Sequence, residues 1–250
     1  MMLRMLWAVM VLLLSGAAVG FAARLPSEAL DLSHWKLTLP TDKSRPGKAD
    51  EIQQPELARF SDPQWFFPAA DGKGVVFRAG CGAPTTKGSK FPRSELREMS
   101  GSDGRENASW STSDTIAHTM VANLAITHLP QAKPHCACAQ IHDAKDDLMM
   151  VRLEGTKLFV ERNKQGDIPL DAQYQLGTFF ELKIEAGNGH VRVWYNGAQK
   201  MDWEVVRQGC YFKAGCYTQS NRSKGDRPEA YGEVVIRALE LDPAPQRLVN

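Results

Sequence analysis

The sequence lacks an excess of charge of either sign. Its 250 residues include 30 Lys and Arg against 29 Asp and Glu, and removal of the N-terminal segment that contains Arg4 leaves 29 of each. Proteins that bind nucleic acid through its phosphates usually carry a basic surplus. We therefore expect no nucleic-acid partner, whereas an acidic ligand bound by a local cluster of cations is compatible with this balance.

Long hydrophobic runs are also missing, with one exception near the N-terminus. Residues 6–14 form an apolar run that is short for a bilayer span, with Arg4 before it and small residues at 15–18 after it. This pattern predicts a secretory signal peptide over residues 1–23. No Cys follows the run where lipid attachment would need one, so we expect a secreted or periplasmic protein with no membrane partner.

Cysteine is scarce, and its spacing is not that of a metal site. The odd count leaves at least one thiol without an intramolecular partner, and the five residues are Cys81, Cys136, Cys138, Cys210 and Cys216. No second ligand pair at zinc spacing accompanies the pair at 136 and 138, so we predict no metal and no other cofactor. If residues 210–216 are an extended strand they span about 20 Å, which excludes a bridge between Cys210 and Cys216 because bridged Cα atoms lie within about 7 Å.

Helical patterns are few, and strand patterns recur along the chain. Only residues 27–30 and 53–60 look helical. Turn sequences such as those at 154–155, 187–189 and 196–197 separate segments that are β-branched, aromatic or alternating in polarity. No repeat or linker follows residue 24, so the sequence predicts one all-β domain over residues 24–250, a jelly-roll sandwich. The predicted strands are 37–40, 74–78, 91–98, 115–126, 139–142, 147–153, 157–162, 181–185, 190–195, 200–206, 211–219 and 231–241.

Polar groups gather on one face of three of these strands, because side chains of a strand alternate between its two faces. In residues 91–98 this places Arg93, Glu95 and Arg97 together. One interpretation is a solvated face with cross-strand ion pairs, and the other is a clamp for a carboxylate ligand, since Arg offers paired donors in a planar fork. Gln140 and His142 share a face in the same way, with Ile141 toward the core.

The segment 211–219 has the sharpest contrast between its two faces. Tyr211, Lys213, Tyr217 and Gln219 lie on the polar face, and an amphipathic surface strand is the alternative interpretation. Gly215 lies between Lys213 and Tyr217 and is predicted to let a ligand approach the backbone. Two long polar loops, residues 79–91 and 220–230, are either solvated connections or lids over a groove.

Three motifs resemble the signature segments of alginate lyases of polysaccharide lyase family 7. They are Arg93-Ser-Glu-Leu-Arg97, Gln140-Ile-His142 and Tyr211-Phe-Lys-Ala-Gly-Cys-Tyr217, and Trp35-Lys-Leu-Thr-Leu-Pro40 is similar to the N-terminal strand of that family. The motifs occur in the family's order and the similarity spans about residues 30–241. Cys216 departs from the pattern, where an aliphatic residue is more usual.

The resemblance implies a concanavalin-like jelly roll whose concave sheet forms a groove for alginate, a linear polyuronate. It implies cleavage by β-elimination without a required metal, giving 4,5-unsaturated uronate ends, and we expect a monomer. Position by position, it assigns carboxylate binding to Arg93 and Gln140, a base or stabilising role to His142, and the acid to Tyr217. Substrate contacts are implied for five further residues: Glu95, Arg97, Tyr211, Lys213 and Gln219.

The chemistry of these residue types fits elimination independently of the resemblance. Elimination needs a neutralised carboxylate, a base for the C5 proton and an acid for the departing O4. Neutral His suits proton abstraction at mild pH, and Tyr normally stays protonated. In mannuronate the C5 proton and O4 lie on the same side, so one Tyr serves both, whereas guluronate divides the work between His142 and Tyr217. Ile141 in the second motif favours guluronate-containing substrate within the family.

Two other functions fit a β-sandwich with a polar groove. A glycoside hydrolase needs two carboxylates, about 5.5 Å apart in retaining enzymes, and Glu95 and Asp143 have no evident carboxylate partner in the sequence. A non-catalytic carbohydrate-binding module needs no acid and base, yet His142 and Tyr217 are both present. The sequence therefore favours the lyase over both alternatives.

Overall fold

Strands are the main regular element of the computed structural model of the chain, which describes residues 25–243. The signal peptide predicted at residues 1–23 lies outside the described residues. Three short helices, α1 (Pro26–Ala29), η1 (Glu56–Arg59) and η2 (Arg222–Lys224), accompany the strands. The strands are β1 (Trp35–Thr38), β2 (Glu51–Ile52), β3 (Phe66–Pro68), β4 (Val75–Gly80), β5 (Arg93–Ser100), β6 (Glu106–Asn107), β7 (His118–His128), β8 (His135–His142), β9 (Asp147–Glu154), β10 (Lys157–Glu161), β11 (Ile168–Asp171), β12 (Phe180–Gly187), β13 (His190–Tyr195), β14 (Ala198–Glu204), β15 (Tyr211–Thr218) and β16 (Tyr231–Asp242).

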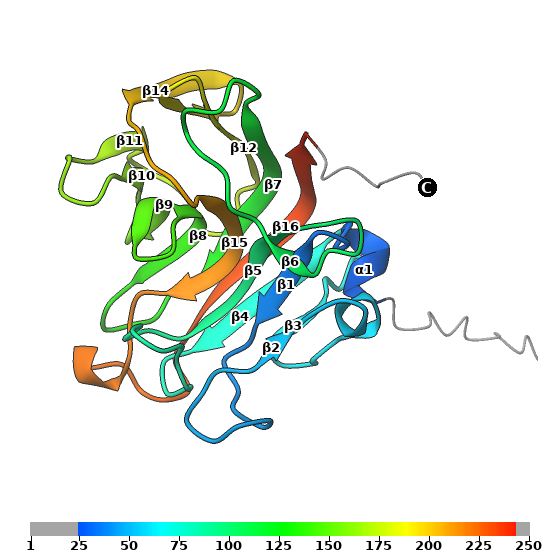
Figure 1. Ribbon diagram of the computed structural model, residues 1–250. Coiled ribbons are helices and arrows are strands. Elements are labelled where there is room, and N and C mark those ends of the chain that lie inside the picture. The colour runs from blue at the N-terminus through cyan, green and yellow to red at the C-terminus, as the bar shows by residue number, and fades with distance from the viewer. Residues whose placement is uncertain (1–24, 244–250) are drawn as a thin grey trace, which may run out of the picture.

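Two antiparallel sheets pack face to face, as in a jelly roll. The first has the order β11-β10-β9-β8-β15-β5-β1-β2, with β6 paired to β5, and the second has the order β14-β13-β12-β7-β16-β4-β3. In Figure 1 β8, β15, β5 and β1 form one layer, and β7, β16 and β4 lie behind them. This arrangement confirms the predicted all-β sandwich of jelly-roll type.

The predicted strands of five residues or more are present in the structure. The predicted helical segment 53–60 forms only the short helix η1, which begins after Pro55 and ends before Phe60, where the backbone is already extended. Four short strands, β2, β3, β6 and β11, are absent from the prediction. They have two to four residues each, which is too short for an alternating pattern to be recognised.

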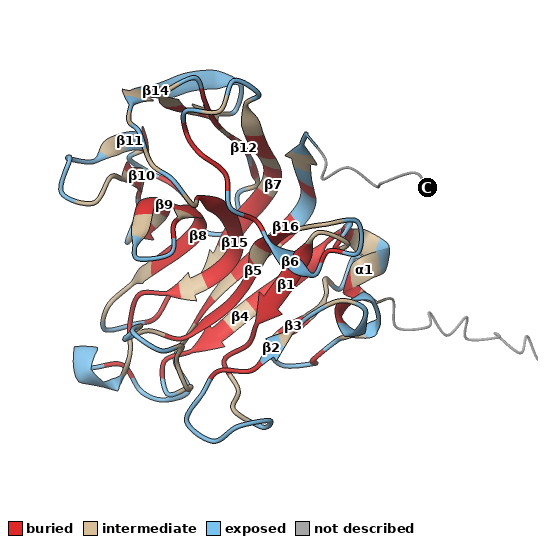
Figure 2. Cartoon of the chain, viewed as in Figure 1, coloured by how far each residue is buried: buried red, intermediate tan, exposed pale blue. Residues whose placement is uncertain are grey.

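The core lies between the two sheets and is built from the inward-facing residues of both. Phe66 and Phe77 of the second sheet are fully buried and pack edge to face, with ring centroids 5.1 Å apart. Leu96 of the first sheet and Met120 and Leu124 of the second are buried in the same cluster. Figure 2 shows the buried residues along the central strands and the exposed ones in the loops. The opposite face of the first sheet is thereby left for polar side chains.

All five cysteines are buried and free in the structure. Cys210 and Cys216 are not bridged, and β15 begins directly after the first and contains the second. Cys136 and Cys216 lie on neighbouring strands with their sulfurs 3.6 Å apart. No helix within residues 25–243 is long and apolar enough to cross a membrane.

Candidate active site

Strand β15 brings the three sequence motifs together, because it lies between β5 and β8. Across β5, Lys213 is opposite Arg97 and Tyr217 is opposite Arg93. On the other side, Tyr211 is opposite His142 and Lys213 is opposite Gln140. Since paired residues of adjacent strands point to the same face, the side chains predicted from sequence alternation meet on the outer face of the first sheet. The three strands lie side by side at the centre of Figure 1.

Glu95 is the centre of the polar cluster on this face. Its carboxylate accepts hydrogen bonds from Arg93 Nη1 at 2.7 Å, from Lys213 Nζ at 2.5 Å and from Gln140 Nε2. The residue is only 1% exposed and does not line the cleft above it. The contact of Glu95 with substrate therefore stays a prediction, and its burial indicates a supporting position below the cleft surface. Its carboxylate holds three neighbouring side chains in position.

Charge is unevenly distributed over this cluster. Burial by itself would raise the pKa of Glu95, but the charges of Lys213 and Arg93 outweigh it and hold the pKa below its ordinary value. Burial, followed by repulsion from Arg93, lowers the pKa of Lys213 to about 8. Arg93, Arg97 and Lys213 thus surround one carboxylate, which leaves two positive charges in excess. Such a floor attracts an anionic ligand.

His142 has one ring nitrogen fixed by the backbone. Its Nδ1 lies 2.5 Å from the carbonyl oxygen of Asp143. Because a carbonyl oxygen only accepts, Nδ1 carries the proton in the neutral ring and Nε2 keeps its lone pair. Burial is the main cause that lowers the pKa of His142, the Asp143 carbonyl opposes it, and Lys213 adds to it. The ring is therefore neutral at mild pH and is able to accept a proton at Nε2.

Tyr217 lies at the other side of the cluster against a guanidinium group. The Cζ atom of Arg93 is 3.7 Å from the centre of the Tyr217 ring. Arg97 stacks on Tyr211 in the same way, at 3.9 Å. Both distances are typical of cation–π pairs. They fix the two arginines and the two tyrosines relative to one another on the sheet.

The two long loops take different positions relative to this cluster. Residues 86–89 of the first loop line the cleft beside Arg93, His142 and Tyr217. The second loop is not among the lining residues, and it contacts the first through a 2.7 Å hydrogen bond from Asn221 Nδ2 to the Lys90 carbonyl. Only the first loop is thus placed to cover a ligand.

Two other residues of the segment 211–219 lie differently from the polar face expected for them. Gln219 follows the last residue of β15, is buried and does not line the cleft, so its contact with substrate stays a prediction. Gly215 does not open a gap for a ligand. A Cβ there would lie 2.6 Å from the Ser94 carbonyl oxygen and 3.0 Å from the Phe77 ring, so glycine is needed because the backbone packs closely against β5 and the core.

The cleft over the cluster encloses about 410 Å³, within the range of small-molecule and oligosaccharide sites. A larger hollow of about 560 Å³ lies elsewhere, beside Trp65, Arg78 and Tyr231. Its lining residues include no histidine, and Arg78 is neutralised there by Glu233 at 2.6 Å. Within residues 25–243 no group of His, Cys, Asp or Glu is arranged to hold a metal ion. The candidate acid and base are thus found in the smaller cleft.

Ser89 and Asp147 are among the lining residues of the cleft that the sequence analysis did not predict. Ser89 Oγ lies 3.0 Å from the Tyr217 hydroxyl. Asp147 is opposite His142 across β8 and β9, and burial together with Asp146 raises its pKa to about 6. Ser89 belongs to an irregular loop, and Asp147 begins a strand whose register the sequence does not give, so neither had a periodic signal.

A jelly roll with a cationic cleft, a neutral histidine and a tyrosine has the groups that an enzyme needs to cleave an acidic polysaccharide by elimination. A family model described as alginate lyase matches residues 30–243. The chain belongs to this family, the alginate lyases of polysaccharide lyase family 7.

Individual relatives agree with this assignment. The structure of alginate lyase AlgAT5 from polysaccharide lyase family 7 is 50% identical, covers 88% of this chain and 98% of its own, and has a TM-score of 0.84. The alginate lyase from Corynebacterium sp. is 43% identical with a TM-score of 0.82, and covers 88% and 98% of the two chains. An alginate lyase of Klebsiella pneumoniae is 24% identical over 89% of this chain and 92% of its own.

Proposed function

We propose that the protein is a secreted enzyme that cleaves alginate by β-elimination and leaves 4,5-unsaturated uronate ends. The single observation that carries this proposal is the placement of His142 and Tyr217 around one cationic cluster in the same cleft. One group is a neutral base, the other is a phenol, and the cations between them suit a carboxylate. These are the three requirements of the reaction.

The cationic cluster would neutralise the uronate carboxylate and make its C5 proton acidic. Arg93 uses two of its nitrogens for Glu95 and Ser89, which leaves further N–H donors of the guanidinium for a ligand. Gln140 donates one amide hydrogen to Glu95, which leaves its second amide hydrogen for a ligand. Charge-assisted hydrogen bonds of this kind are the strong ones. The negative charge that develops on the carboxylate during proton removal would strengthen them.

Proton removal at C5 falls to Nε2 of His142 when the proton and O4 lie on opposite sides of the ring, as in guluronate. Tyr217 then donates the phenolic proton to O4 while the C4–O4 bond breaks and the C4–C5 double bond forms. In mannuronate both groups lie on the same side, and Tyr217 would serve as base and acid in turn. Because the pKa of His142 lies below its ordinary value, its neutral form persists into mildly acidic solution.

We propose a preference for guluronate-containing substrate. The support is Ile141 between Gln140 and His142, together with the neutral histidine that an opposite-side elimination needs. The related alginate lyase A1-II′, 25% identical with a TM-score of 0.73, is solved with a substrate designated GGMG. We further propose export through the N-terminal segment and action as a monomer.

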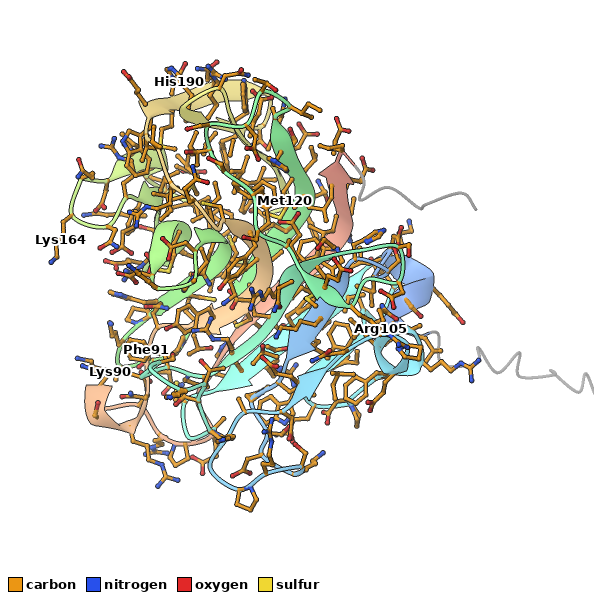
Figure 3. The ribbon with its side chains drawn as sticks, viewed as in Figure 1. Lys90, Phe91, Arg105, Met120, Lys164 and His190 are labelled. Carbon is orange, nitrogen blue, oxygen red and sulfur yellow. The ribbon has the colours of Figure 1, made fainter. Side chains whose placement is uncertain are left out.

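The test is to digest pure polymannuronate and polyguluronate blocks side by side with the purified protein. An unsaturated uronate absorbs in the ultraviolet, so we expect absorbance to rise, faster on polyguluronate, and mass spectrometry to give products without added water. Products that carry water would instead indicate a hydrolase, and binding without turnover would indicate a carbohydrate-binding module. His142→Ala should abolish cleavage of polyguluronate. His190→Ala is the matched control, since His190 lies on β13 of the other sheet. In Figure 3 it is far from Phe91, the residue that packs on Tyr217.

A further inference from the structure

Ser89 connects the first long loop to the two groups proposed to act on the substrate. Its Oγ lies 3.0 Å from the Tyr217 hydroxyl and 3.3 Å from Arg93 Nη2. The same oxygen is 3.2 Å from the backbone N–H of Phe91 and 3.0 Å from the Phe91 carbonyl oxygen. A single side-chain hydroxyl therefore has four polar neighbours, and its bonding capacity limits how they are shared.

A serine hydroxyl has two lone pairs and one proton. The two nitrogen neighbours, of Phe91 and Arg93, are obligatory donors, and together they fill both lone pairs. Tyr217 is then left as an acceptor, so the Ser89 proton is directed either to the Tyr217 oxygen or to the Phe91 carbonyl. When it is directed to Tyr217, the phenolic proton is free to point into the cleft, where a donor to O4 is needed.

We propose that Ser89 is a positioning residue for the acid, which orients the Tyr217 proton toward the substrate and stabilises the phenolate that remains after transfer. This inference rests on the proposed β-elimination. As the phenolic O–H bond breaks and an O4–H bond forms, the Tyr217 oxygen becomes anionic while the Phe91 carbonyl stays neutral. The Ser89 proton is then held by the anionic Tyr217 oxygen, because hydrogen bonds to charged groups are about twice as strong as those between neutral groups.

The loop geometry holds Ser89 in place for this role before substrate binds. Its backbone N–H donates to the Thr86 carbonyl at 3.0 Å, and its own carbonyl accepts from Thr85 Oγ1 at 3.0 Å. Phe91 packs edge to face on Tyr217, with ring centroids 6.4 Å apart. Preorganised donors contribute most to catalysis, since they need no rearrangement during the reaction.

The test compares Ser89→Ala, Ser89→Thr and the wild-type chain on polyguluronate. A hydrogen bond to a charged group corresponds to roughly 10- to 100-fold, so Ser89→Ala should lower kcat by about that factor with KM nearly unchanged. Ser89→Thr keeps the hydroxyl and should recover most of the loss. Ser102→Ala, an exposed serine of the turn after β5 that does not line the cleft, is the control. Circular dichroism and thermal melting establish that each variant is folded.

A double variant separates action through Tyr217 from a general effect on the loop. In the Tyr217→Phe background no phenolic oxygen is present, so adding Ser89→Ala should give no further loss of residual rate. Three results would overturn the proposal: an unchanged kcat in Ser89→Ala, a change confined to KM, or a failure of Ser89→Thr to restore the rate. Failure of the wild-type protein to form unsaturated product would instead overturn the proposed function itself.

Discussion

Replacing Glu95 by Gln removes one negative charge from the centre of the cleft floor. The wild-type carboxylate is 1% exposed and accepts from Arg93, Lys213 and Gln140. The amide of Gln keeps one acceptor oxygen and turns an NH₂ group toward the cations. Arg93, Lys213 and the nearby Arg97 then have no counterion in the cluster, so both stability and the positions of these side chains should suffer.

The expected loss follows from the burial of the charges. Removing one partner of a buried ion pair costs about 3–5 kcal/mol, because the remaining charge stays desolvated without compensation. That is a large part of the total stability of a domain, about 5–15 kcal/mol. Glu98→Gln is the matched control on the same strand. One Glu98 oxygen accepts from Trp110 Nε1 and Phe212 N at 2.8 Å each, and an amide oxygen keeps both bonds at a cost of about 1 kcal/mol or less.

The assay is urea unfolding of both variants and the wild-type protein at neutral pH and in acid. The pKa of Glu95 in the folded protein lies below its ordinary value. Its stabilising contribution is therefore complete above the unfolded pKa of about 4.3, and it is lost as the pH falls through the lower folded value. The difference between wild type and Glu95→Gln should thus be large at pH 7 and shrink in strong acid. We also expect a marked fall of kcat.

Two results would refute this reasoning. If the unfolding free energy of Glu95→Gln is within 1 kcal/mol of the wild-type value at pH 7, the Glu95 carboxylate does not compensate the positive charges of the cluster. If the difference between the two proteins is the same in acid, the loss comes from packing and not from ionisation. A large loss of unfolding free energy in Glu98→Gln as well would show that β5 tolerates no substitution. It would count against the expected difference between Glu95 and Glu98.

Four further predictions test the site and its surroundings. Tyr217→Phe should lower kcat on alginate by about 10²–10⁴-fold without unfolding the protein, and near-normal turnover would remove Tyr217 from the mechanism. Arg93→Lys should be almost as damaging as Arg93→Ala in steady-state kinetics, since Lys lacks the planar fork that meets Glu95, Ser89 and substrate together; normal kinetics would mean that charge alone suffices. Burial raises the pKa of Glu98 to about 7, so the unfolding free energy should fall by roughly 3 kcal/mol as the pH rises from the unfolded value to above 7, and a pH titration of Glu98→Gln should lack this fall. Peptide mapping of the unreduced protein should find no bridge between Cys210 and Cys216, and such a bridge would contradict the extended β15 strand.

Local alternation along each strand is enough to predict which residues share a face. The two-residue period of strands placed Arg93 with Arg97, Gln140 with His142, and Lys213 with Tyr217, because alternation is a local property of the backbone. It also determined the all-β class, since turn residues and β-branched segments recur along the whole chain. The motifs indicated the family for the same reason, as each is a short continuous segment.

Which strands are neighbours is known only from the folded chain. The placement of β15 between β5 and β8 depends on pairing between segments more than 60 residues apart, which no local pattern encodes. That pairing directs three donors onto Glu95, so its carboxylate is buried in the floor of the cleft. It packs Gly215 against Ser94 and Phe77, and it places an irregular loop so that Ser89 meets Tyr217. Periodicity fixes the direction of a side chain, whereas its partners depend on long-range packing.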